Sequence, residues 1–210
     1  MDNETRTPDT QSETPDETKA PKEKRTLRDY LGDIYELLEM LGVVSATIMI
    51  IFAFVFRLNI VDGHSMDVTL AHGEYLGVSD LFYEPTPGDI VIVHKINADP
   101  YVNPIVKRVI ATEGQTVDID FSTWTLRVDG EIIDEPYRYI SDDMLLTSDW
   151  TFPVTVGENE IFVMGDNRNN SADSRTEEIG MIDTRCVIGK AYVRIFPMNK
   201  FEVFENPRKS

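Results

Sequence analysis

The sequence predicts a mainly β domain that follows one membrane-spanning helix. Residues 40–56 form a run of 17 residues without a charge. After this run, several short segments rich in β-branched residues are separated by turn residues, which is typical of strands. In that region, no segment repeats its apolar residues with a helical period over more than about one turn. The segments are 88–95, 104–111, 125–133, 160–165 and 186–196.

The first 27 residues are predicted to be a disordered tail. They carry seven acidic and five basic side chains and almost nothing apolar. A segment of this composition cannot bury enough apolar surface to offset the entropy lost on ordering.

The uncharged run at 40–56 reaches the lower limit of about 17–25 residues for a helix that crosses a bilayer. A core helix of a soluble protein would normally have a polar face, and this run has none. It also begins too late, and is too long, for the apolar region of about 7–15 residues in a removable signal peptide. We therefore expect an uncleaved anchor within 28–61.

Basic residues indicate the orientation of this anchor. Only Arg57 lies close behind the run, whereas five basic residues lie just before it: Lys19, Lys22, Lys24, Arg25 and Arg28. By the positive-inside rule, the N-terminus lies in the cytoplasm. The chain is then a single-pass protein of the cytoplasmic membrane, with residues 62–210 on the outer face.

Composition excludes several classes of function. The net charge is −17, from 37 acidic and 20 basic residues, which argues against nucleic acid as a partner because phosphate binding needs a basic face. Cys186 is the single cysteine, so a disulfide within the chain and a cysteine-rich metal site are excluded. The three histidines lack the spacing of a metal motif, and we expect no metal and no cofactor.

The segment 125–133 contains the clearest turn. Asp129 and Gly130 separate two β-branched runs, and both residue types tolerate positive φ, which predicts a hairpin.

Two residues could form a nucleophile and its base. Ser65 follows the anchor, and a serine needs a base to remove its proton. Lys107 lies in an apolar run, and desolvation can lower the pKa of a lysine far enough for that task. His64 is adjacent to Ser65, and neighbours in an extended chain point to opposite faces, so we interpret the histidines as surface or structural residues. Spacing alone does not bring Ser65 and Lys107 together, and a solvated lysine remains the alternative.

Four blocks of sequence, in this order, resemble those of bacterial type I signal peptidases in their short, single-anchor form. They are VDGHSMDVTL (61–70), GDIVIV (88–93), KRVIATEGQTV (107–117) and GDNRNNSADSR (165–175), with Gly180 behind the last. Members of this family are membrane-anchored Ser-Lys endopeptidases that remove signal peptides from exported proteins.

The resemblance assigns roles residue by residue. It implies that Ser65 is the nucleophile and Lys107 the general base. Ser171 would hydrogen-bond the Lys107 amine and orient it, and Asp173 and Arg175 would form a supporting salt bridge.

Five further residues receive roles from the same resemblance. Asp166 and Arg108 would be structural near the site, and Met66 would pack beside the nucleophile. Val61 and Val106 align with positions that line small pockets for the −1 and −3 residues of the signal peptide.

The resemblance also implies a fold and partners. The fold is an antiparallel coiled β-sheet domain preceded by one transmembrane helix. The partners are exported precursors with cleavable signal peptides and the lipid bilayer, and we expect a monomer.

The chain departs from the family pattern at four positions. Val68 replaces a usual proline, which bears on the rigidity of the backbone after the nucleophile. Ala111 and Gln115 replace a glycine and an aspartate, which bears on the turn after the base. Gly63 stands where some relatives have a serine that donates to the oxyanion, so the oxyanion would rest mainly on the Ser65 N–H.

Rival functions are less compatible with the sequence. The related endoplasmic-reticulum form uses a histidine where Lys107 stands, and self-cleaving repressors need a DNA-binding module for which the acidic tail and anchor leave no room. The remaining alternative is a catalytically impaired β domain that acts as a secretion scaffold or binding module. It would predict loss of Ser65 or Lys107, and both are present.

Overall fold

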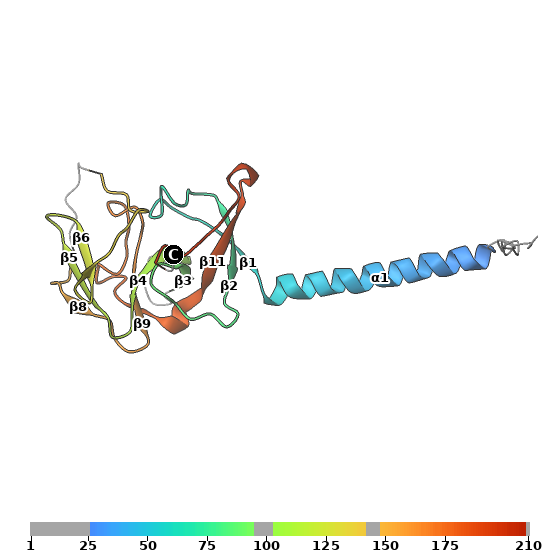
Figure 1. The fold of residues 1–210 in the computed structure, drawn as a ribbon, viewed down its shortest axis with the longest axis horizontal. Coiled ribbons are helices and arrows are strands. Elements are labelled where there is room, and N and C mark those ends of the chain that lie inside the picture. The colour runs from blue at the N-terminus through green and yellow to red at the C-terminus, as the bar shows by residue number, and fades with distance from the viewer. Residues whose placement is uncertain (1–25, 95–102, 142–147, 209–210) are drawn as a thin grey trace, which may run out of the picture. The chain divides into compact units, whose positions relative to one another are not determined.

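A computed structural model describes residues 26–94, 103–141 and 148–208 (Figure 1). Nearly all of the predicted tail, 1–27, therefore lies outside the described residues. The chain divides into two compact units, Met1–Ala46 and Thr47–Ser210.

Helix α1 spans Leu27–Phe54. It begins with a capped turn, because Asp29 accepts hydrogen bonds from the backbone N–H and the hydroxyl of Thr26. By length and composition, its stretch Leu27–Phe52 could cross a membrane. The uncharged run at 40–56 thus falls within α1 except for its last two residues.

The larger sheet has the strand order β1-β2-β11-β3-β4-β9-β10, with β12 paired to β11, and the pairings between its described strands are antiparallel. The strands are β1 (Arg57–Ile60), β2 (Tyr75–Ser79), β3 (Ile90–Val93), β4 (Ile105–Thr112), β9 (Glu160–Met164), β10 (Ile182–Asp183), β11 (Val187–Phe196) and β12 (Glu202–Val203). Two short 3-10 helices flank β11: η1 (Thr184–Cys186) and η2 (Met198–Lys200).

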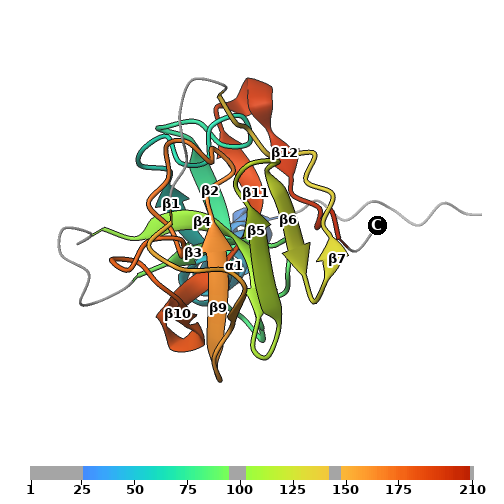
Figure 2. The same ribbon diagram turned by 90° about the vertical axis from the view of Figure 1, so that its left-hand side faces the viewer.

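The smaller sheet has the order β7-β6-β5-β8. Its strands are β5 (Thr116–Asp120), β6 (Thr125–Val128), β7 (Glu131–Ile132) and β8 (Val154–Thr155). Within the second unit, β5, β6 and β8 lie at one end, and β1, β2 and β11 at the other (Figure 1). Figure 2 shows β5 and β6 side by side.

The predicted strands and hairpin are confirmed. The five segments contain β3, β4, β6 with β7, β9 and β11. Asp129 and Gly130 join β6 to β7 with φ of 54° and 85°. The fold class, a mainly β domain with one N-terminal apolar helix, is therefore as predicted.

The sheet begins earlier in the chain than the expected boundary at residue 62. Residues 57–60 pair with β2 and do not extend the helix. Leu58 and Ile60 alternate with Arg57 and Asn59, and this period of two fits a strand better than a helix. The short strands β2, β5, β8, β10 and β12 were not predicted either.

Strand β4 connects the packed regions of the second unit. Val106 belongs to a core cluster with residues of β2, β3 and the loop after β1. Val109 packs in a second cluster with residues of β3 and β9, and Ile110 packs in a third, shared with β5 and β6. Since packed cores resist displacement, β4 is a rigid support for Lys107.

Candidate active site

Ser65 lies in the loop that joins β1 to β2. Buried side chains of Met66 and Leu70 fix this loop to the core. The loop ends are tied together because Val61 donates its N–H to Glu74 O, and Gly73 donates to Val61 O, both at 2.9 Å. Ser65 itself is half-buried.

Lys107 reaches the same place from β4. Its side chain and Ser65 line one cleft of about 430 Å³. Within the described parts of the chain, the Lys107 amine donates to Ser171 Oγ at 3.1 Å, and no hydrogen bond joins it to Ser65. Catalytic hydrogen bonds are often long in ligand-free enzymes and shorten when substrate binds. The structure therefore brings the predicted nucleophile and base into one cleft.

Ser171 is held in turn by a buried ion pair. Its hydroxyl donates to Asp173 Oδ2 at 2.7 Å, so its lone pairs face Lys107. Arg175 donates to both carboxylate oxygens of Asp173 at 2.8 Å. The contacts expected for these three residues are thus present, while their catalytic roles stay predictions.

Burial determines the protonation of this group. Lys107 is 2% exposed, and burial lowers its pKa from the ordinary 10.5 to about 8. The charge of Asp173 opposes this shift, and that of Arg175 adds to it. Burial by itself would raise the pKa of Asp173, but the charge and hydrogen bonds of Arg175 outweigh it, and the pKa lies below the usual range. The site therefore combines an ionised carboxylate with an amine that is partly neutral near pH 8.

Asp166 and Arg108 form a second buried ion pair beside the site. Arg108 donates to the two oxygens of Asp166 at 2.8 and 2.6 Å. It also donates to Gly88 O, and the Thr69 hydroxyl donates to Asp166 at 2.6 Å. The pair thus links the loop of Ser65 to β4, which fits the structural role that was expected.

Gly165 and Asn167 were not predicted, although both lie in the block 165–175. A Cβ at Gly165 would overlap Ser171 Oγ and the Ser65 carbonyl oxygen. Asn167 donates its backbone N–H to Ser65 O at 3.0 Å and its side-chain amide to His64 O at 3.1 Å. These two residues let the loop of Ser65 and the segment of Ser171 approach closely.

A third buried ion pair, between Arg168 and Glu135, was also missed. Arg168 donates to both oxygens of Glu135 and to Gly165 O. The partners are 33 positions apart in the sequence, which explains why no local pattern indicated the pair. It braces the segment of Ser171 against the chain that follows β7.

The proposed substrate pockets stay a prediction. Val61 and Val106 are buried in the core, and neither lines the described cleft, whose apolar lining near Lys107 includes Ile105 and Ala172. On a strand, neighbours point to opposite faces, which is why Val106 faces the core while its neighbours on β4 face the cleft.

The departures from the family pattern have visible consequences. Val68 has φ of +86°, which proline cannot adopt and which strains a β-branched residue. Gln115 closes the turn after β4, since its side chain accepts from Thr112 N and donates to Asp129. Ala111 is buried between the sheets, and the register of β4 against β9 shifts beside it.

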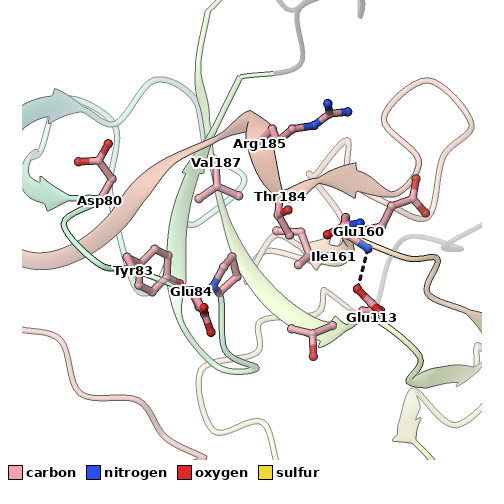
Figure 3. Close-up of a pocket in the computed structure, with 12 residues that line it drawn as sticks. Asp80, Tyr83, Glu84, Glu113, Glu160, Ile161, Thr184, Arg185 and Val187 are labelled. Atoms are coloured by element: carbon pink, nitrogen blue, oxygen red, sulfur yellow. Dashed lines mark hydrogen bonds between the residues drawn. The ribbon is translucent and has the colours of Figure 1, made fainter.

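A larger cleft of about 560 Å³ lies elsewhere in the same unit and contains none of the predicted site residues (Figure 3). Its lining includes Asp80, Glu84, Glu113 and Glu160. Size therefore does not identify the candidate active site, whereas the buried amine does.

Comparison with known proteins agrees with the blocks of sequence. Residues 34–196 match the family described as Signal peptidase, peptidase S26. The chain belongs to this family. The signal peptidase I of Bacillus licheniformis is 37% identical over 180 residues, which cover 80% of this chain and 92% of that protein. The signal peptidase IB of Staphylococcus aureus (strain MRSA252) is 30% identical, over 83% of this chain and 97% of that protein.

A solved structure of a signal peptidase I from Enterococcus faecalis is also similar to this S26 family member. It is 28% identical, covers 51% of this chain and 97% of that chain, and superposes with a TM-score of 0.41. All ten residues that the sequence singled out for the site lie within the matched range 34–196.

Proposed function

We propose that this chain is a signal peptidase I, a serine endopeptidase that removes signal peptides from exported precursors. The observation that carries the proposal is a buried amine, Lys107, in one cleft with Ser65. Membership of the S26 family and the names of the relatives support the substrate class.

The first half of the reaction forms an acyl-enzyme. Neutral Lys107 takes the proton of the Ser65 hydroxyl while the oxygen attacks the scissile carbonyl. The resulting ammonium gives that proton to the leaving amine, and the mature protein departs. In the second half, Lys107 takes a proton from water while the oxygen of that water attacks the ester carbonyl. The ammonium then returns the proton to Ser65 Oγ as the ester bond breaks, which releases the signal peptide and regenerates neutral Lys107.

Ser171 keeps Lys107 productive throughout this cycle. Its hydroxyl proton is directed to Asp173, so it accepts from Lys107 and leaves the amine lone pair for Ser65. The ion pair of Asp173 with Arg175 fixes Ser171 in this orientation.

The oxyanion rests on the Ser65 backbone N–H. Among the residues that the structure describes, no hydrogen bond uses this N–H. One such donor can contribute about 10²–10³ in rate. The substrate backbone lies extended and pairs with the domain strand to strand. Small side chains at −1 and −3 occupy shallow apolar pockets, which the resemblance assigns to Val61 and Val106.

The anchor places this chemistry at the membrane. Helix α1 spans the bilayer, the basic residues before it stay in the cytoplasm, and the peptidase domain of residues 62–210 lies on the outer face as a monomer. Tethering raises the effective concentration of a precursor that its own signal helix holds in the same bilayer. Thiol labelling tests this topology in a Cys186→Ala background. A membrane-impermeant maleimide should label Ser122→Cys in intact cells and spare Ser12→Cys in the tail, and the reverse pattern would overturn the orientation.

The deciding experiment is cleavage of an Ala-x-Ala precursor in lipid by the full chain. Wild type should cut after the −1 alanine, and Ser65→Ala and Lys107→Ala should be inactive while folded. Ser122→Ala and Lys200→Ala, which change the same residue types outside the cleft, should retain activity. A folded, membrane-inserted wild type without activity would favour the alternative, a secretion scaffold.

A further inference from the structure

The polar groups around Ser65 are held from two sides. On one side, Asn167 binds the carbonyl oxygens of His64 and Ser65. On the other side, Gly63 donates its N–H to Nδ1 of His72 at 3.2 Å. Two residues before the nucleophile, the backbone is thus fixed by a histidine side chain.

This contact requires Nδ1 of His72 to be an acceptor. An imidazole nitrogen accepts a hydrogen bond only when it carries no proton, so the contact requires the ring form with its proton on Nε2. Protonation of Nδ1 would remove the acceptor of Gly63. The Asp62 carboxylate, 3.5 Å from the same nitrogen, would then receive the new N–H.

We propose that His72 is a positioning residue for the nucleophile, which holds the loop of Ser65 through Gly63. Gly63 has φ of +98°, and a residue without Cβ has the most backbone freedom to lose on ordering, so a hydrogen bond to its N–H restricts it effectively. The bond also occupies the Gly63 N–H, so this group is not available to the oxyanion.

Several charged or titratable groups face His72, and each belongs to the same loop. Asp62 contacts its Nδ1, and the ring of His64 lies 5.9 Å away, tilted by 38°. His64 is paired with Asp67 at 3.0 Å.

The inference rests on the proposed function for its activity test. At pH 8, His72→Ala should lower kcat for the precursor by about threefold to tenfold with KM nearly unchanged, which corresponds to the loss of one hydrogen bond. His72→Asn should restore the rate because its side-chain oxygen takes the place of Nδ1. His72→Gln should not restore it, since its oxygen lies one bond farther out. The His72 side chain is 58% exposed, so these variants should fold.

Rescue by a matched side chain separates positioning from a structural role. The control His94→Asn, at a histidine outside the cleft, should retain the wild-type rate. Equal kcat for wild type and His72→Ala, or equal kcat for His72→Asn and His72→Gln, would overturn the inference.

A second measurement does not depend on activity. In the full chain in micelles, with histidine and glycine labelled by ¹⁵N, the His72 ring should be in the Nε2–H form. The amide signal of Gly63 should move in His72→Ala and return toward its wild-type position in His72→Asn. A ring protonated on Nδ1 at pH 8, or a Gly63 signal that is the same in wild type and His72→Ala, would refute the positioning role even if the enzyme proved inactive.

Discussion

Replacement of Asp173 by asparagine should move the acid limb of the activity profile to lower pH. The Asp173 carboxylate favours the charged form of Lys107, so its removal favours the neutral amine that acts as base. With a pKa of about 8, roughly a tenth of the amine is neutral at pH 7, about 300-fold more than for a lysine of pKa 10.5. Asp173→Asn should enlarge this fraction further.

The size of the shift follows from the geometry. Two hydrogen bonds, of 3.1 and 2.7 Å, join Lys107 Nζ to Asp173 through Ser171, so the charges lie within about 6 Å. At an effective dielectric constant near 20, the attraction is about 3 kcal/mol, or about two pKa units. Solvent near the cleft reduces this value, and we expect a fall of about one to two units, from about 8 to about 6–7.

The assay is kcat/KM for an Ala-x-Ala precursor between pH 5.5 and 9.5. Asp120→Asn, a matched change at the last residue of β5, should leave the limb in place. The double variant Asp173→Asn/Arg175→Gln removes both charges. Because the charge of Arg175 lowers the pKa of Lys107, the acid limb of the double variant should lie between those of wild type and Asp173→Asn. Circular dichroism verifies folding. A limb that stays near pH 8 or moves upward in folded Asp173→Asn would refute the reasoning.

Three further predictions concern packing and backbone. Val68→Gly should raise the free energy of unfolding by about 1 kcal/mol, because glycine relieves the strained φ of +86° at a residue that is 73% exposed. Val68→Pro should lower the free energy of unfolding, and urea titration measures both changes. Gly165→Ala should reduce kcat by about a hundredfold or more, because its Cβ overlaps Ser171 Oγ, and a rate near wild type would contradict the close approach. Glu135→Gln should lower the free energy of unfolding by about 3–5 kcal/mol, because Arg168 is left buried without its charge partner. An unchanged urea midpoint would show that the ion pair contributes little.

Local patterns were sufficient for much of the fold. Strands β3, β4, β6, β7, β9 and β11 and the turn at Asp129-Gly130 could be predicted because alternation and turn chemistry depend on adjacent residues. Short elements such as β8 and β10, of two residues each, carry too little pattern to be recognised. Their strand geometry comes from pairing with β5 and β9.

The candidate site was predicted by resemblance of its blocks, which also implied the contact of Ser171 with Lys107 and the pair of Asp173 with Arg175. The sequence by itself determined which residues could act, Ser65 and Lys107, because their chemistry is intrinsic to their side chains. Tertiary structure decided that Lys107 is buried and that Ser171 and Asp173 hold it. The contact of Gly63 with His72 was equally invisible in the sequence. The physical reason is that desolvation and hydrogen-bond geometry depend on groups distant in the chain, which only the packed fold brings together.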